Sequence, residues 1–90
     1  MFLNIGKKQS VLYDDIIAVI DIEKSKSKIN SEFIEYMMKN DSCIVLGKVI
    51  RSAIIVEKNG ECIVYLSPVS IMSLKKRLLI MNTFRKNKVG

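Results

Sequence analysis

A predicted hairpin turn is the feature that most constrains the fold of this chain. In the stretch SAIIVEKNGECIVYL, Asn59 and Gly60 separate two runs rich in β-branched residues. Both residue types tolerate a positive φ, so Asn-Gly between such runs predicts two antiparallel strands joined by a type I′ turn. In that register Lys58 pairs with Glu61 across the hairpin. The turn therefore predicts that this part of the chain forms an antiparallel pair of strands.

Shorter apolar runs predict four more strands. They are residues 2–5, 11–13, 16–22 and 43–46. The third of these runs is rich in β-branched residues and is typical of a buried strand. The segment GKKQ between the first two runs is a turn candidate. Residues 23–30, in which Lys and Ser alternate, predict an exposed loop.

Two segments have the pattern of helices. The first starts at Asn30 or Ser31, either of which can cap it, and carries one broad apolar face. The second follows Ser67 as its cap, with Pro68 in its first turn. Together with the strands, these helices predict an α+β fold in the order β-β-β-α-β-β-β-α. Its core is a small mixed or antiparallel sheet with a long hairpin.

The second helix carries two apolar stripes. The first stripe is Ile71, Leu74, Leu78 and Met81, and the second is Val69, Met72 and Leu79. One stripe suffices to pack on the sheet. The second stripe is either a contact with a neighbouring subunit or part of a single wide buried face, and both interpretations remain open. In either case the basic side chains between the stripes extend to the rim.

The balance of charge favours polyanionic partners. Lys and Arg number 15 against nine Asp and Glu, a net charge of +6 on 90 residues, which suits DNA, RNA or an acidic membrane surface. A chain of this length is one domain, expected over residues 1–82 with a basic tail at 83–90. No apolar run approaches the roughly 20 residues that span a bilayer. The start of the chain lacks the apolar segment of a signal peptide, so we expect a cytoplasmic protein without a membrane partner.

The content of cysteine and histidine limits the catalytic and metal-binding chemistry that we expect of this chain. Cys43 and Cys62 lie in apolar runs and are expected to be buried reduced thiols, with a disulfide as the alternative if their strands lie side by side. Histidine, the commonest general base and metal ligand, is absent. No phosphate-binding glycine loop and no zinc-ligand spacing occurs. We therefore expect no enzymatic activity, no metal, no cofactor and no small-molecule substrate.

Basic residues gather in four places. These are Lys7 and Lys8; Lys24, Lys26 and Lys28; Lys48 and Arg51; and Arg85, Lys86 and Lys88. Ordinary solvation explains any one of them. The third place is the most specific, because the glycine of LGKVIRS lets the backbone approach a ligand and two cations there can reach neighbouring phosphates. Few aromatic residues accompany the cations, so recognition of single-stranded RNA by base stacking is not expected.

Three stretches together resemble one family. They are MFLNIG, DDIIAVIDIE and VYLSPVSIMSLKKR, in that order. They resemble the short RemB-type proteins of Gram-positive bacteria, which are relatives of the RemA regulators of extracellular-matrix genes. The resemblance covers about residues 1–77. The family's G-R-R-x-R stretch corresponds to GKVIR here, where Lys48 and Arg51 keep the charge and Val49 replaces a basic residue.

This resemblance implies a small α+β protein that assembles into a ring and presents basic residues to double-stranded DNA. The expected DNA-binding residues are Lys48, Arg51, Lys7, Lys8, Lys75, Lys76 and Arg77, and the expected subunit contacts are Val69, Met72 and Leu79. Asp15 stands where RemA-type members carry a basic residue, so it lowers the expected phosphate affinity, as Val49 does. The expected function is transcriptional regulation of matrix or biofilm genes. The alternative is a structural or interaction protein that oligomerises without functional DNA binding.

Overall fold

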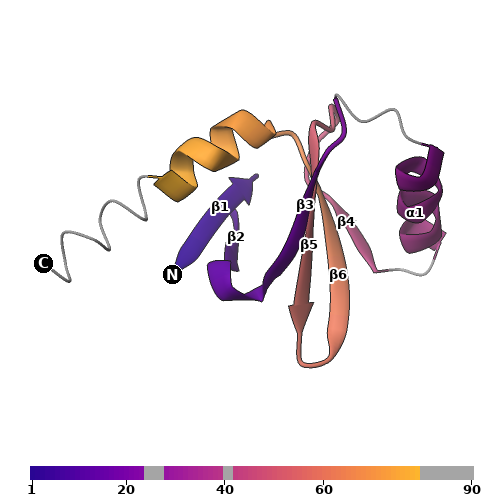
Figure 1. Cartoon of the computed structure of the whole chain (residues 1–90), viewed down its shortest axis with the longest axis horizontal. Coiled ribbons are helices and arrows are strands. Elements are labelled where there is room, and N and C mark those ends of the chain that lie inside the picture. The colour runs from indigo at the N-terminus through magenta and orange to yellow at the C-terminus, as the bar shows by residue number, and fades with distance from the viewer. Residues whose placement is uncertain (24–27, 40–41, 80–90) are drawn as a thin grey trace, which may run out of the picture.

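A four-stranded sheet forms the centre of the computed structural model, which describes residues 1–23, 28–39 and 42–79 (Figure 1). Its strands, in the order β3-β5-β6-β4, are β3 (Ile16–Asp21), β5 (Ser52–Lys58), β6 (Glu61–Ser67) and β4 (Cys43–Val45). β5 and β6 form the predicted hairpin, with Lys58 opposite Glu61. Asn59 and Gly60 have positive φ angles of 54° and 80°. The predicted turn geometry is therefore confirmed.

A second sheet of two strands comes first in the chain. β1 (Phe2–Gly6) and β2 (Gln9–Leu12) pair antiparallel, and a short 3₁₀ helix, η1 (Tyr13–Asp15), leads from β2 into β3. The α+β class is confirmed, but the predicted single sheet and the exact element order are wrong. The physical reason is that β1 and β2 bury their apolar side chains against the face of the larger sheet, so they do not extend its edge.

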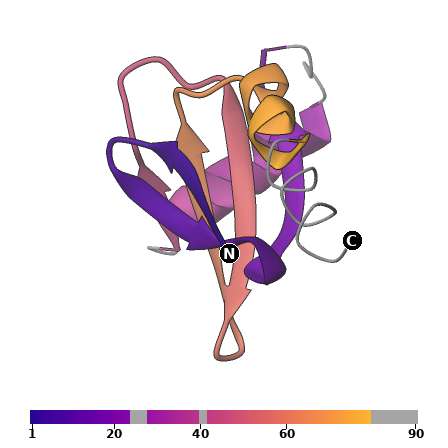
Figure 2. The ribbon, with the colours of Figure 1, turned by 90° about the vertical axis from the view of Figure 1, so that its left-hand side faces the viewer.

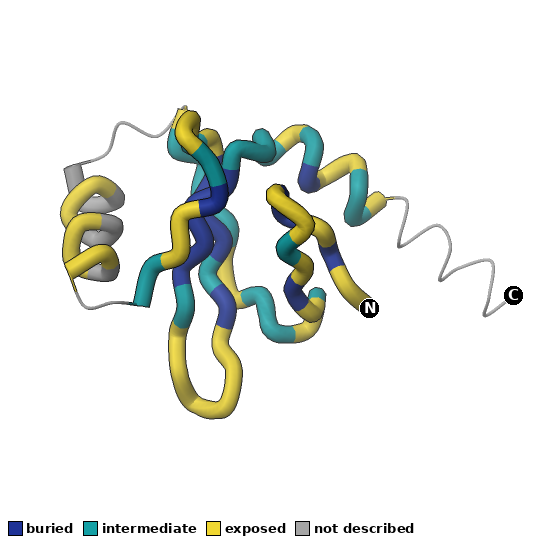
Figure 3. The backbone as a smooth tube through the Cα atoms, turned by 180° about the vertical axis from the view of Figure 1, so that it is seen from behind, coloured by how far each residue is buried: buried dark blue, intermediate teal, exposed yellow. Residues whose placement is uncertain are grey.

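Both faces of the four-stranded sheet are covered. The β1–β2 hairpin and the helical residues 71–79 lie on one side, and α1 (Lys28–Lys39) lies on the other (Figure 1). The buried cluster facing the hairpin is Leu3, Ile5, Val11, Leu46, Ile54, Val56, Tyr65 and Leu74. A second cluster, Ala53, Val64 and Leu66, uses the alternate residues of β5 and β6 and therefore faces the other way. The halves of β5 and β6 away from the hairpin tip are buried, whereas the tip is exposed (Figure 3).

β3 departs from its predicted environment. The prediction of a buried strand is wrong, because no residue from Ile16 to Asp21 is fully buried. The strand order places β3 at one edge of the sheet, where it pairs with β5 alone. The edge position leaves β3 partly open to solvent. Local composition cannot predict this position, because it depends on which strands pair.

α1 also differs from its prediction. It begins at Lys28, earlier than the predicted caps Asn30 and Ser31, so the last residues of the predicted loop belong to the helix. Tyr36 and Met38 are 62% and 51% exposed. The apolar face predicted for this helix is therefore not wholly buried.

The helix after β6 starts later than predicted. Its helical backbone is described over residues 71–79, and the Ser70 hydroxyl accepts a hydrogen bond from the Ser73 N–H at 3.2 Å. Ser70 is thus the N-cap. The prediction that Ser67 caps the helix, with Pro68 in its first turn, is wrong. Ser67 is the last residue of β6, and its hydroxyl is engaged in another part of the fold.

The cysteines are both free thiols. Cys43 is half-buried, and this burial raises the pKa of its thiol. Cys62 is exposed, so the prediction of a buried thiol is wrong there. Cys62 lies close to the hairpin tip, beyond the part of β6 that the other elements cover.

Some predictions fall on parts of the chain that the structure does not describe. Lys24, Lys26, Met81 and the basic tail at 83–90 lie outside the described residues. None of the helices in the described ranges combines the length and apolar character required to cross a membrane.

Candidate nucleic-acid interface

Pro68 lies between two glycines that come from distant parts of the chain. A Cβ at Gly6 would lie 3.2 Å from the Pro68 Cδ, and a Cβ at Gly47 would lie 3.1 Å from the Pro68 Cβ. Both distances are shorter than ordinary van der Waals contact, so a side chain at either glycine would crowd the proline ring. The β1–β2 turn follows Gly6, and the connector of residues 46–51 contains Gly47. Pro68 therefore brings these two basic segments together, at the upper left of Figure 2.

Two buried serines form hydrogen bonds that hold these segments together. Ser67 donates its hydroxyl proton to the Ile5 carbonyl oxygen at 2.5 Å and accepts from the Val69 N–H at 2.9 Å. Ser52 donates to the Val69 carbonyl oxygen at 2.7 Å. The Arg51 N–H also donates to the Ser67 carbonyl oxygen at 2.8 Å. The end of β1, the end of the connector and the start of the helical segment are thus held at one end of the sheet.

Four of the predicted DNA-binding residues surround this junction. Lys7, Lys8, Lys48 and Arg51 are all exposed. Their side chains form no ion pair or hydrogen bond with any other residue that the structure describes. Exposed cations without an internal partner remain available to an external anion. We therefore define these four residues as the basic junction.

The β1–β2 turn has an unusual backbone. Lys7 and Lys8 are the two central residues of the turn, and their φ angles are 49° and 61°. This left-handed region costs a residue with a Cβ about 1–2 kcal/mol and normally holds glycine or asparagine. Strained positions of this kind concentrate at functional sites. The two lysines therefore occupy positions for which stability alone would favour other residues.

The predicted helix cations divide into two environments. Lys75 and Lys76 are exposed. Arg77 donates from its Nη1 to the Asn4 carbonyl oxygen at 2.5 Å and to Asn4 Oδ1 at 3.4 Å. The same Oδ1 accepts from the Gly6 N–H at 3.1 Å. Arg77 thus links the helix to the strand that leads into the basic turn, and its role in binding DNA stays a prediction.

The three predicted subunit contacts differ in their exposure to solvent. Val69 packs against the core cluster. Met72 and Leu79 are 65% and 64% exposed. The second stripe is therefore partly buried in the chain itself and partly open.

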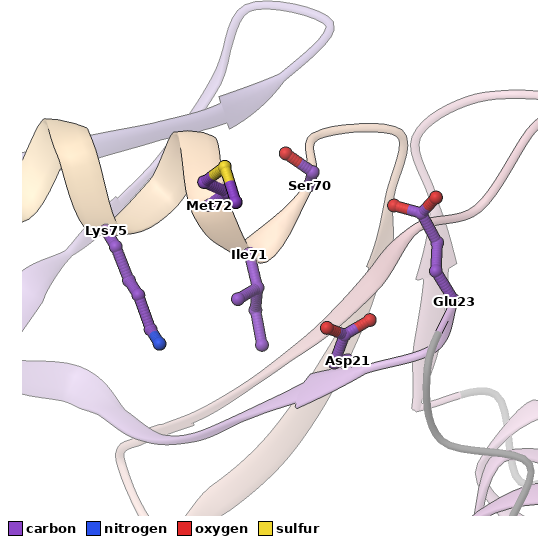
Figure 4. Close-up of a pocket in the computed structure, with 6 residues that line it drawn as sticks. All are labelled: Asp21, Glu23, Ser70, Ile71, Met72 and Lys75. Atoms are coloured by element: carbon purple, nitrogen blue, oxygen red, sulfur yellow. The ribbon is translucent and has the colours of Figure 1, made fainter.

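A pocket of about 510 Å³ lies between the end of β3 and the start of the helical segment (Figure 4). It is lined by Asp21, Glu23, Ser70, Ile71, Met72 and Lys75.

The sequence predictions missed several of these residues. They did not place Asp21 and Glu23 in a site, and they did not identify Ser52, Ser67 and Asn4 as the residues that hold the basic segments together. A serine in an apolar run is a weak sequence signal by itself, because the partners of Ser52 and Ser67 lie 17 and 62 residues away in the chain. Within the described part of the chain, no group of three or more His, Cys, Asp or Glu could hold a metal ion.

Comparison with known proteins identifies the family. The model of the RemA-like family, described as extracellular matrix regulatory protein A-like, matches residues 2–78. No curated protein matches the chain. The matched range contains the six strands β1 to β6, the basic junction and the helical segment as far as Leu78. The chain belongs to the RemA-like family of extracellular matrix regulatory proteins.

Proposed function

We propose that this protein binds double-stranded DNA and regulates transcription of matrix or biofilm genes in the cytoplasm, as a ring-like homo-oligomer without enzymatic activity or a cofactor. The observation that carries the proposal is the basic junction. Pro68 packs between Gly6 and Gly47, which gathers two basic segments far apart in the sequence at one end of the sheet. Family membership supports the regulatory role.

The chemistry of the junction suits phosphates rather than bases. Lysine and arginine side chains on short turns present charge without a helix or strand that could enter a groove, so they contact the backbone of the duplex. Such contacts release counterions, and each contributes about −0.9 to the slope of log K against log salt. Several subunits that bind one duplex would add their contacts and raise the affinity through effective concentration.

The test is a salt titration of fluorescence anisotropy on duplex DNA. Replacing Lys48 and Arg51 together with alanine is expected to flatten the slope by about 2 per subunit engaged. The loss is expected to be similar for unrelated DNA sequences, because phosphates carry no base identity. Competition with single-stranded RNA distinguishes a duplex-binding protein from a small RNA-binding module.

A matched control removes the same charge elsewhere. Lys39 at the end of α1 and Lys58 at the hairpin tip are both exposed and lie outside the junction. Replacing these two with alanine is expected to leave the slope largely unchanged. Equal slopes for the wild type and the Lys48–Arg51 variant would remove the connector from the DNA surface.

One observation favours the alternative function. Val49 lies in the middle of the basic connector and is 64% exposed. An exposed apolar residue in this position suits a protein contact better than a phosphate contact. A structural or interaction protein is therefore the second candidate. Assembly in solution without salt-dependent binding to duplex DNA would identify it.

A further inference from the structure

A small cavity opens between the β1–β2 hairpin and the β5–β6 hairpin. Its volume is about 200 Å³, and none of the four residues of the basic junction lines it. β2 and the first residue of β1 form one wall, and side chains from β5 and β6 form the other. An apolar cavity of roughly 150 Å³ is enough to bind benzene. The size of this cavity therefore suits a molecule with a single ring.

Tyr65 lines this cavity and carries a polar group without a partner. The residue is 8% exposed, and its hydroxyl forms no hydrogen bond with any residue that the structure describes. Among those residues, no fully enclosed side-chain oxygen or nitrogen lacks a hydrogen-bond partner, so the Tyr65 hydroxyl reaches accessible space, and the cavity is the space that Tyr65 lines. A buried tyrosine normally finds a partner for this group. The Tyr65 hydroxyl is therefore available to a molecule from outside the chain.

Two opposite charges mark the end of the cavity nearest the β5–β6 turn. Lys58 is the last residue of β5, and Asp15 directly precedes Ile16, which pairs with Val56 near the same end of β5. Both charged residues line the cavity, and neither forms an ion pair with a described residue. The cavity thus offers a carboxylate to an ammonium group and an ammonium group to a carboxylate.

Apolar side chains lie between these charges and Tyr65. The β5–β6 register places the Val56–Ile63 pair between them. On the other wall, Phe2 and Leu12 pair with each other and are 68% and 36% exposed. A ring held against these side chains removes apolar surface from water, which stabilises a complex. A mostly apolar lining with a few polar groups is typical of small-molecule sites.

We propose that this cavity binds a small zwitterion with a hydroxylated aromatic ring, which is the chemistry of a tyrosine-like amino acid. The ring lies between the two walls, and its hydroxyl group bonds to the Tyr65 hydroxyl. The ammonium group of the ligand faces Asp15, and its carboxylate faces Lys58. The ligand is bound unchanged. The site shares no residue with the basic junction, so this inference does not rest on DNA binding.

An NMR titration of the isotope-labelled protein with L-tyrosine tests the proposal. The backbone amide signals of Val11, Val56 and Tyr65 are expected to shift and to saturate below the solubility limit of L-tyrosine, whereas signals from α1 should stay unchanged. Three analogues each lack one group: phenylalanine lacks the hydroxyl, tyramine the carboxylate and hydroxyphenylpropionate the ammonium group. Each is expected to bind about tenfold more weakly, because it leaves one polar group of the site without its partner.

Tyr65→Phe isolates the hydroxyl contact. This variant is expected to weaken the binding of L-tyrosine about tenfold and to leave the affinity for phenylalanine unchanged. Urea denaturation should give the wild-type free energy of unfolding, because the hydroxyl has no partner to lose among the described residues. Tyr13→Phe is the matched control, since Tyr13 does not line the cavity. It should leave both affinities unchanged.

The two charge contacts are tested in the same way. Asp15→Asn is expected to weaken L-tyrosine about tenfold but not hydroxyphenylpropionate, which has no ammonium group. Lys58→Gln is expected to weaken L-tyrosine about tenfold but not tyramine, which has no carboxylate. Asp14→Asn is the control for charge, because Asp14 is exposed and does not line the cavity.

A lack of saturating shifts with L-tyrosine would overturn the inference, and so would shifts confined to residues outside the cavity. Equal affinity for L-tyrosine and its analogues would also overturn it, because the cavity would then be an unselective apolar cleft. A Tyr65→Phe variant that weakens L-tyrosine and phenylalanine equally would refute the contact with the Tyr65 hydroxyl. None of these variants alters the basic junction, so each outcome is separable from the proposed DNA binding.

Discussion

Ser52 and Ser67 lie opposite each other across the β5–β6 pair, and both side chains are fully buried. Their hydroxyl groups point to different segments. Ser67 donates to the Ile5 carbonyl oxygen in β1, whereas Ser52 donates to the Val69 carbonyl oxygen before the helix. One serine pair thus fixes two segments to the same end of the sheet, and the position of the basic junction depends on it.

Ser67→Ala is expected to lower the free energy of unfolding by about 1–3 kcal/mol, because the buried Ile5 carbonyl loses its donor and the Val69 N–H loses its acceptor. Urea denaturation measures the change. Ser10→Ala is the matched control, since Ser10 is exposed. Similar losses for the two variants would contradict the anchoring role of Ser67.

The β1–β2 turn is expected to show a conflict between stability and function. Replacing Lys7 with Asn and Lys8 with Gly supplies residues suited to positive φ, so stability should rise by about 1–2 kcal/mol. The DNA salt slope should flatten by about 2 per subunit engaged. Thermal melts and anisotropy titrations measure the two effects.

The control for this turn is Lys7→Ala with Lys8→Ala, which removes both charges without relieving the backbone. It should reproduce the loss of slope but not the gain in stability. A turn variant that gains stability and keeps the full slope would show that these lysines do not contact DNA.

The packing of Gly47 against Pro68 predicts an energetic coupling. Gly47→Ala places a Cβ 3.1 Å from the Pro68 Cβ and Cγ, and such crowding costs about 1–3 kcal/mol. In a Pro68→Gly background the opposing atoms are gone, so the same substitution should cost less. A double-mutant cycle by urea denaturation measures the difference. Additive effects would mean that the two residues do not interact.

Gly60→Val is expected to cost about 1–3 kcal/mol through backbone strain. Gly60 has a φ of +80°, and a Cβ there would meet nothing within 4 Å, so no steric clash contributes. Gly60→Asn is the control, because asparagine tolerates this region. Identical melting curves for the Val and Asn variants would argue against strain at this position.

Met72 offers a test of assembly through the helix. It is 65% exposed and lines the pocket beside β3. Met72→Glu would bury a charge in a subunit contact, which costs on the order of several kcal/mol. Light scattering should then report smaller particles with an unchanged far-UV spectrum, whereas Met38→Glu on α1 should not alter the particle size. The prediction fails if the wild type is monomeric at high micromolar concentration.

The local elements were predictable because short-range forces decide them. Asn59-Gly60 specifies its turn through backbone sterics alone, and the register of the hairpin follows from that turn. GKKQ was predicted as a turn candidate because it separates two short apolar runs, and β1 and β2 pair on either side of it. The connector with Lys48 and Arg51 was predicted as basic and is exposed.

Tertiary structure alone decided which of these elements meet. Ser67 was predicted as a helix cap from its neighbours, but its hydroxyl bonds to Ile5, 62 residues away. Arg77 contacts Asn4 across 73 residues. Composition predicted β3 to be buried, yet its place at the edge of the sheet depends on which strands pair. The physical reason is that propensity acts over a few residues, whereas pairing and burial depend on the packing of the whole chain.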